Sequence, residues 1–187
     1  VAEAAGLSLG NLQHYYPSKE LLVAAMLDRV IEGYLQRFAR IRQSASDPEV
    51  EFRELISHVF LDLGSRRTTV FFPELWSMAN HDPQVAEHME RMYQRYREVL
   101  GDAIARLNPA LDQATVRRLA LFVSASIEGH GMFVGHGRPW RGQIRELLEM
   151  ATQSFLLLIR DVKAGSEPAC LQAPGATGVL HKLGRLN

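Results

Sequence analysis

The chain has 187 residues, 47% of them hydrophobic and 22% charged, and its 21 basic and 21 acidic side chains leave no net charge. This composition suits one soluble globular domain, or a small domain fused to a larger one. Zero net charge argues against wholesale coating of nucleic acid, although a local binding face needs only a few cations. Cys170 is the only cysteine, which excludes an intrachain disulfide. No apolar run approaches the ~20 residues of a membrane span, so we expect a cytoplasmic protein without membrane contact.

The spacing of apolar residues is helical along nearly the whole chain, and no sustained two-residue alternation predicts a strand. Glycines, prolines and Asp-Pro or Asn-Pro pairs divide this pattern into segments. The predicted helices cover residues 1–5, 9–15, 18–44, 48–64, 68–80, 83–107, 112–134 and 141–164. Residues 165–187, rich in glycine, proline and small side chains, are expected to form a loose tail. The predicted fold class is therefore all-α.

The opening stretch has the plan of a helix-turn-helix. Gly6 fits a position of positive φ just past a helix end, and Ser8 is a good N-cap for a second helix. Pro17 stops that second helix, because it lacks an amide hydrogen and restricts the residue before it. Ser18 can then cap a third, long helix.

The second helix, 9–15, carries groups suited to DNA. Leu12 and Tyr16 mark its buried side, and the amides of Asn11 and Gln13 can pair with an adenine edge in the major groove. Groups that can donate to phosphates come from His14, Tyr15 and Lys19. From the spacing alone, a polar helical hairpin with its rings packed on a neighbour is an equal alternative.

The stretch AEAAGLSLGNLQHYYPSKELLVAAM resembles the end of the DNA-binding domain of the tetracycline-repressor (TetR) family of transcription regulators. The matching skeleton is Ala-Gly-aliphatic-Ser, then Gly-x-Leu, two aromatics, and Ser-Lys-Glu-x-Leu. The resemblance implies that the residues at the DNA surface are Ser8, Leu9, Gly10, Gln13, His14 and Tyr15, with Lys19 on a phosphate. The family more often has tyrosine at position 13, which leaves operator preference open.

The chain starts inside the first helix of the motif that this family shares. We therefore expect residues 1–28 to be a partial helix-turn-helix domain that lacks its first helix, a loss that would expose apolar surface and weaken the domain. The resemblance further implies that residues 29–164 form a helical ligand-binding and dimerisation domain. The long helix from Ser18 joins the two parts and is the expected mechanical link.

Methionine and aromatic side chains are more frequent in this larger domain than a tight aliphatic core needs, and such side chains adapt to ligands. Taken singly, most of them are expected to be ordinary core residues, and only as a set do they indicate a pocket. In the apolar helix 116–134, a buried Glu128 would need a partner, which His130 or a ligand could supply; the alternative places Glu128 at a surface or dimer seam. The candidate pocket residues are Phe72, Trp76, Met89, Met92, Tyr93, Tyr96, Phe122, Ser126, Glu128, His130 and Phe133.

The last helix has two apolar faces, which predicts that one packs on its own domain and the other on a second copy. The resemblance implies the same arrangement, a four-helix interface from the last two helices of each subunit. The candidate interface residues are Ile144, Leu147, Leu148, Ala151, Phe155 and Leu158, with Met150, Ser154 and Leu157 on the adjoining face. A monomer whose final helix is simply central is the alternative.

No His, Cys or carboxylate spacing of a zinc site and no catalytic motif is visible, so we expect no metal, no cofactor and no enzyme activity. We interpret the chain as a homodimeric, ligand-responsive transcriptional regulator, most simply a repressor. Its expected partners are a near-palindromic double-stranded operator and a mainly apolar small molecule with one polar group. The alternative is a helical carrier of lipids or small molecules that has no DNA role.

Overall fold

The computed structural model describes Glu3, Gly6 and residues 8–162, and every regular element in those residues is helical. The predicted all-α class is therefore confirmed, while the expected helix at 1–5 and the expected tail at 165–187 fall on residues that are largely outside the described ones. The helices are α1 (Leu9–Tyr15), α2 (Lys19–Ser44), α3 (Pro48–Asp62), α4 (Arg66–Ala79), α5 (Pro83–Leu107), α6 (Gln113–Val134), the short 3-10 helix η2 (Arg141–Gln143) and α7 (Ile144–Asp161).

Each of the helices α1 to α6 begins where a short polar side chain can accept a backbone N–H, which explains why the predicted starts are close to the observed ones. The N-cap residues are Ser8, Ser18, Asp47, Ser65, Asp82 and Asp112. Proline occupies the first position of α3 and of α5, where its missing N–H costs nothing. Gly6 has the predicted positive φ, at 68°. The last predicted helix, 141–164, divides into η2 and α7.

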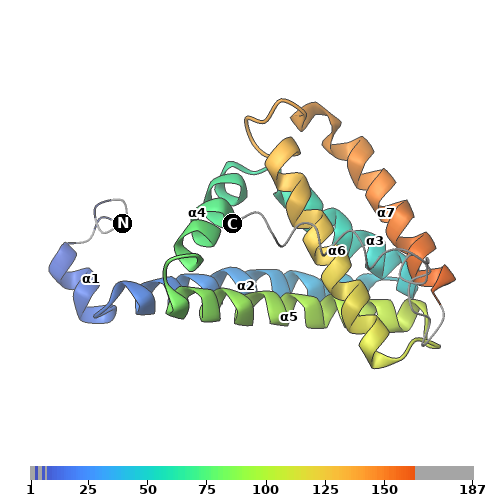
Figure 1. Cartoon of the computed structure of the whole chain (residues 1–187), viewed down its shortest axis with the longest axis horizontal. Helices are drawn as coiled ribbons and strands as arrows, with labels where there is room; N and C mark the ends of the chain where they lie inside the picture. Colours follow the sequence, from blue (N-terminus) through green and yellow to red (C-terminus); the bar gives the residue numbers. More distant parts are fainter. Residues whose placement is uncertain (1–2, 4–5, 7, 163–187) are drawn as a thin grey trace, which may run out of the picture.

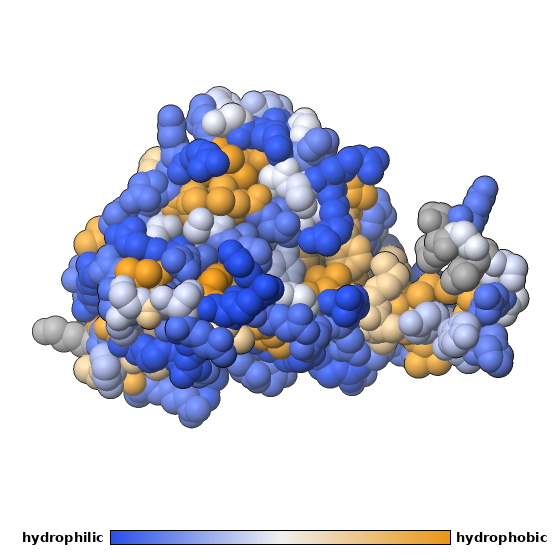
Figure 2. Space-filling model, turned by 180° about the vertical axis from the view of Figure 1, so that it is seen from behind, coloured by the Kyte–Doolittle hydropathy of each residue, from blue (hydrophilic) through white to orange (hydrophobic). Residues whose placement is uncertain are grey.

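The helices build a roughly triangular body from which α1 stands out (Figure 1). The two longest helices, α2 and α5, lie side by side and form its base. The helices α4, α6 and α7 form the other sides of the body, and α3 packs against α2, α5 and α7. From behind, apolar patches interrupt the polar surface both on the body and at the α1 end (Figure 2). None of the helices in the described residues is long and apolar enough to span a membrane.

The helix α5 packs against five other helices, and α3 contributes two fully buried rings, Phe52 and Phe60, to the core. On α2 the buried positions include Leu27 and Ile31, whereas Met26, one residue away, is 39% exposed. This buried face continues through Phe38 and Ile41, so α2 packs against the body from Leu27 nearly to its end. Three residues, Tyr16 to Ser18, connect α1 to the start of α2.

Candidate DNA-reading helix and ligand cavity

The short helix α1 is held by its two caps rather than by burial. The Ser8 hydroxyl accepts the N–H of Asn11 at 3.1 Å, and the N–H of Tyr16 donates to the carbonyl of Leu12 at 2.8 Å. No residue of α1 is buried, and Leu12 and Tyr16 are half-buried, on the side predicted to face inward. The helix therefore presents most of its surface to solvent.

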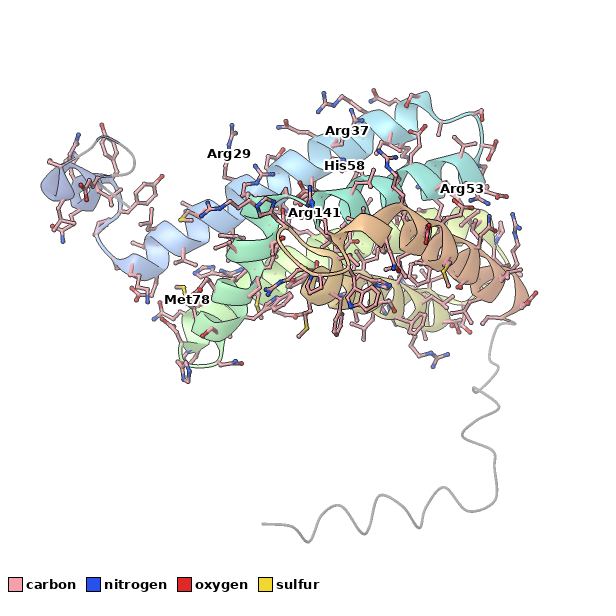
Figure 3. The ribbon with its side chains drawn as sticks, turned by 90° about the horizontal axis from the view of Figure 1, so that it is seen from above. Arg29, Arg37, Arg53, His58, Met78 and Arg141 are labelled. Carbon is pink, nitrogen blue, oxygen red and sulfur yellow. The ribbon has the colours of Figure 1, made fainter. Side chains whose placement is uncertain are left out.

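All eight predicted DNA-contact residues lie at the molecular surface. The exposed set is Ser8, Leu9, Gly10, Asn11, Gln13, His14, Tyr15 and Lys19. The ring of Tyr15, 70% exposed, meets the ring of His14 edge to face at 5.4 Å. The view from above shows α1 apart from the body, with Arg29 of the following helix pointing into solvent (Figure 3).

Two cavities in the helical body share part of their walls. The inner chamber has a volume of about 30 Å³ and the outer cavity about 440 Å³. The residues that line both are Leu63, Thr68, Phe72 and Glu128. The inner chamber is completed by Val30, Ile31, Tyr34, Val59, Met92, Tyr93 and Tyr96. The outer cavity is completed by Thr69, Pro73, Trp76, Ser77, Asn80, Gly131, Met132 and Arg138.

Three tyrosines from α2 and α5 line the inner chamber, and the hydroxyl groups of two of them form hydrogen bonds with other side chains. The hydroxyl of Tyr34 donates to Asp62, which also accepts the hydroxyl of Thr68 at 2.7 Å. The hydroxyl of Tyr93 accepts the indole N–H of Trp76 at 3.0 Å. Burial raises the pKa of all three phenols well above the ordinary value.

The third tyrosine, Tyr96, differs from the other two. Its hydroxyl is buried and has no hydrogen-bond partner among the described residues. Its ring is held in place by stacking on Phe38, with 6.0 Å between ring centroids. A buried donor without an acceptor is rare in native proteins, which marks this position as unusual.

Glu128 on α6 lies where the inner chamber meets the outer cavity. It makes no hydrogen bond or ion pair with any residue that the structure describes, and burial raises the pKa of its carboxyl to about 7. Its charge also raises the pKa of Tyr93 and Tyr96, which are its electrostatic neighbours. Near neutral pH both the protonated carboxyl and the carboxylate of Glu128 are therefore populated.

The structure brings together some of the predicted pocket residues and leaves others apart. The inner chamber includes Phe72, Met92, Tyr93, Tyr96 and Glu128, and Trp76 lines the outer cavity. The remaining predicted residues, Met89, Phe122, Ser126, His130 and Phe133, line neither cavity.

These remaining residues have other contacts. Phe122 and Phe133 are 52% and 60% exposed, and Met89 packs against the core. The ring of His130 lies 4.9 Å from that of Phe60, and its Nδ1 is 2.6 Å from the carbonyl of Ser126. The hydroxyl of Ser126 donates to the carbonyl of Phe122 at 2.7 Å. Local contacts within α6 thus occupy two of the polar groups predicted to meet a ligand.

The inner-chamber residues that the sequence did not single out for a pocket come from α2, α3 and the start of α4. They include Val30, Tyr34, Val59, Leu63 and Thr68. Aliphatic residues and a lone threonine carry no signal for a cavity, since only the packing of distant helices makes them neighbours.

The six predicted interface residues of α7 lie towards their own domain. Phe155 is buried and the others are half-buried and packed against the core, namely Ile144, Leu147, Leu148, Ala151 and Leu158. The adjoining face is the exposed one: Met150 is 65% exposed and Leu157 is 58% exposed. In the described residues, no group of three His, Cys, Asp or Glu side chains could hold a metal ion.

The fold is that of TetR transcription regulators. A crystal structure of such a regulator from Haloarcula marismortui superposes with a TM-score of 0.65, with 18% identity, over 87% of this chain and 84% of that one. A TetR-family regulator from Bordetella parapertussis gives a TM-score of 0.60, with 20% identity, over 83% and 80% of the two chains.

The family follows from the sequence match. The model of the C-terminal domain of BetI-type transcriptional repressors matches residues 48–157, more than half of the chain. The chain therefore belongs to the family of BetI-type transcriptional repressors, a family of regulators rather than enzymes.

Two curated relatives illustrate the family. The regulator BetI of Paraburkholderia xenovorans is 28% identical over 133 residues, which are 69% of this chain and 66% of the relative. An uncharacterized HTH-type transcriptional regulator in the dhlA 5' region of Xanthobacter autotrophicus is 29% identical over 113 residues, 57% of this chain and 54% of the relative. The chain thus spans between half and two thirds of the length of these relatives.

Proposed function

We propose that the protein is a cytoplasmic transcriptional repressor that binds operator DNA through α1 and releases it when a small molecule occupies the cavity. The observation that carries this proposal is the course of α2. Its first residues follow the reading helix, and its middle residues Val30, Ile31 and Tyr34 form one wall of the inner chamber. A ligand that moves this wall also moves α1.

The ligand has an effect only if it binds the two positions of α2 unequally. The hydrogen bonds of Asp62 with Tyr34 and Thr68 tie the middle of α2 to the junction of α3 and α4. Both of these partners line the inner chamber. A ligand that rearranges this network would therefore favour a different setting of α2.

The effector that fits the cavity is a mainly apolar molecule with one polar group. Aromatic and aliphatic side chains form most of the inner wall, and the outer cavity of about 440 Å³ lies in the usual range for small-molecule sites. The polar group would meet Glu128, which has no partner of its own among the described residues.

We also propose that the protein acts as a homodimer through α6 and α7. The exposed apolar side chains on these helices include Leu121, Phe122, Met150 and Leu157, and the Phe122 ring contacts the ring of Phe155 on α7. A two-fold dimer would hold its reading helices about 34 Å apart, which suits a near-palindromic operator.

The DNA role is tested by operator binding of the full-length protein to its own promoter region. Replacing Gln13 by Ala should weaken binding by about 1–3 kcal/mol, because a base-edge contact is lost. Replacing Lys19 by Ala should weaken binding to all DNA sequences. It should also reduce the slope of the logarithm of the binding constant against the logarithm of the salt concentration by about 1. The control, Gln36→Ala, removes an exposed glutamine from α2 away from the reading helix.

Fluorescence anisotropy over a range of salt concentrations measures both effects. Unchanged binding in both variants would show that α1 is not the reading surface. A wild-type protein that binds apolar ligands but no DNA would favour the helical carrier instead.

A further inference from the structure

Two polar groups that line the inner chamber, the hydroxyl of Tyr96 and the carboxyl of Glu128, have no hydrogen-bond partner among the described residues. The buried hydroxyl of Tyr96 is a donor without an acceptor, and the carboxyl of Glu128 forms no hydrogen bond within the described residues. Both line the same chamber of about 30 Å³. That volume accommodates one group the size of a water molecule or a hydroxyl.

We propose that the inner chamber is a hydroxyl-binding site, and that the effector is an apolar alcohol or phenol whose hydroxyl lies between Tyr96 and Glu128. This inference rests on the proposed function, because it names the chemical class of the ligand for the same cavity. The apolar part of the ligand would extend past Phe72 into the outer cavity, which shares this wall with the chamber.

A hydroxyl suits this pair of groups better than the other polar groups of comparable size. It accepts the hydrogen of Tyr96 and donates its own hydrogen to Glu128. An ammonium group only donates, so it would pair with the carboxylate but leave the hydrogen of Tyr96 without an acceptor. A carbonyl only accepts, so it would leave an ionised carboxylate without a donor.

The raised pKa of Glu128, about 7, fits the same conclusion. A carboxylate would accept from the ligand's hydroxyl, and a protonated carboxyl would donate to it. A neutral hydroxyl therefore binds in either protonation state, whereas an ammonium group is favoured only by the carboxylate.

The other two tyrosines provide an internal comparison. Tyr34 already donates to Asp62, and Tyr93 accepts from Trp76. Because the hydroxyl of Tyr96 has no such partner, its removal breaks no hydrogen bond within the described residues. A Tyr96→Phe variant should therefore fold with unchanged or slightly higher thermal stability.

The test compares three probes that share a phenyl ring and differ in one terminal group: benzyl alcohol, benzylamine and ethylbenzene. Isothermal titration calorimetry with the full chain should show benzyl alcohol binding roughly tenfold more tightly than ethylbenzene. Tyr96→Phe should reduce this preference to about twofold or less. Tyr93→Phe should keep the preference for the alcohol, even if it changes the overall affinity. Phenol and toluene, compared in the same way, should give the same order.

Three results would overturn the inference. The first is that neither benzyl alcohol nor phenol binds the wild-type protein. The second is that Tyr96→Phe keeps the full preference for the alcohol. The third is that benzylamine binds more tightly than benzyl alcohol and loses this advantage in Glu128→Gln, which would identify a cation site. A separate operator-binding assay without any probe keeps the proposed function distinct, because DNA binding by the ligand-free protein does not depend on which chemical group the chamber prefers.

Discussion

Two glutamates, Glu51 and Glu128, differ in whether another side chain of the protein pairs with their carboxylate. Glu51 on α3 is only 5% exposed, and its carboxylate accepts two hydrogen bonds from the guanidinium of Arg106, at 3.0 and 2.6 Å. Glu128 on α6 has no comparable partner among the described residues, and burial raises its pKa to about 7. The first is therefore committed to the fold, while the second remains free to meet a ligand.

The raised pKa of Glu128 predicts that stability falls as pH rises. The folded protein holds the proton of Glu128 up to about pH 7, whereas the unfolded chain loses it near the ordinary value of 4.5. Between these values the folded state binds more protons, so a higher pH favours unfolding. From about pH 5 to about pH 8, this one group should remove roughly 2–3 kcal/mol of unfolding free energy.

Urea unfolding of the wild type and of Glu128→Gln measures this contribution. The variant cannot ionise at position 128, so the difference in unfolding free energy between the two proteins should change in favour of the variant as pH rises. A difference that stays constant across this range would mean that Glu128 is ionised in the folded protein throughout.

At the scale of elements, two glycines differ in whether the surrounding packing leaves room for a side chain. A Cβ at Gly135, just after α6, would lie 2.6 Å from the carbonyl oxygen of Gly131 and 2.7 Å from the hydroxyl of Thr69. Because one of these atoms belongs to the backbone, the junction would have to shift. Gly135→Ala should therefore lower the unfolding free energy by about 1–3 kcal/mol.

The matched variant is Gly33→Ala. Gly33 lies in the interior of α2, and a Cβ there would meet no atom within 4 Å. Alanine is the better helix former, so this variant should gain about 0.5–1 kcal/mol. Thermal unfolding of both variants measures whether each one loses or gains stability. A gain in stability for Gly135→Ala would contradict the packing at that junction.

The elements were predictable because their ends depend on local chemistry. A cap such as Ser18 or Asp82 acts within a few residues, so the sequence alone indicates where the helix starts. The composition of the cavity depends on which helices pack together, and nothing near Tyr34 or Thr68 in the sequence indicates that they face Glu128.

The all-apolar character of α6 explains why sequence reasoning chose some pocket residues that the structure places elsewhere. A helix that is apolar on nearly every face gives no sign of which face meets a cavity. The structure turns Glu128 towards the chamber and Phe122 and Phe133 towards the surface. The apolar periodicity of α6 indicated that several faces of the helix are buried, but it could not tell which face packs against the core, a ligand or a partner.

At the scale of the whole molecule, the exposed apolar side chains of α6 and α7 form the surface through which we propose that two copies associate. Leu121 on α6 is 54% exposed and Leu157 on α7 is 58% exposed. In the proposed dimer these side chains are buried between two copies. A double variant, Leu121→Glu with Leu157→Glu, should therefore be monomeric, because charges at the centre of such an interface lose their hydration.

The double variant should keep the fold of each chain, since both positions are exposed in the single chain and surface changes usually alter stability by less than about 0.5 kcal/mol. The control is Val70→Glu on α4, which changes another exposed apolar residue, 52% exposed, on a helix outside the proposed interface. Light scattering after size-exclusion chromatography should give a dimer for the wild type and the control and a monomer for the double variant. The monomer should also lose most of its affinity for a two-half-site operator, because each reading helix then binds alone. A double variant that remains dimeric would place the interface elsewhere on the molecule.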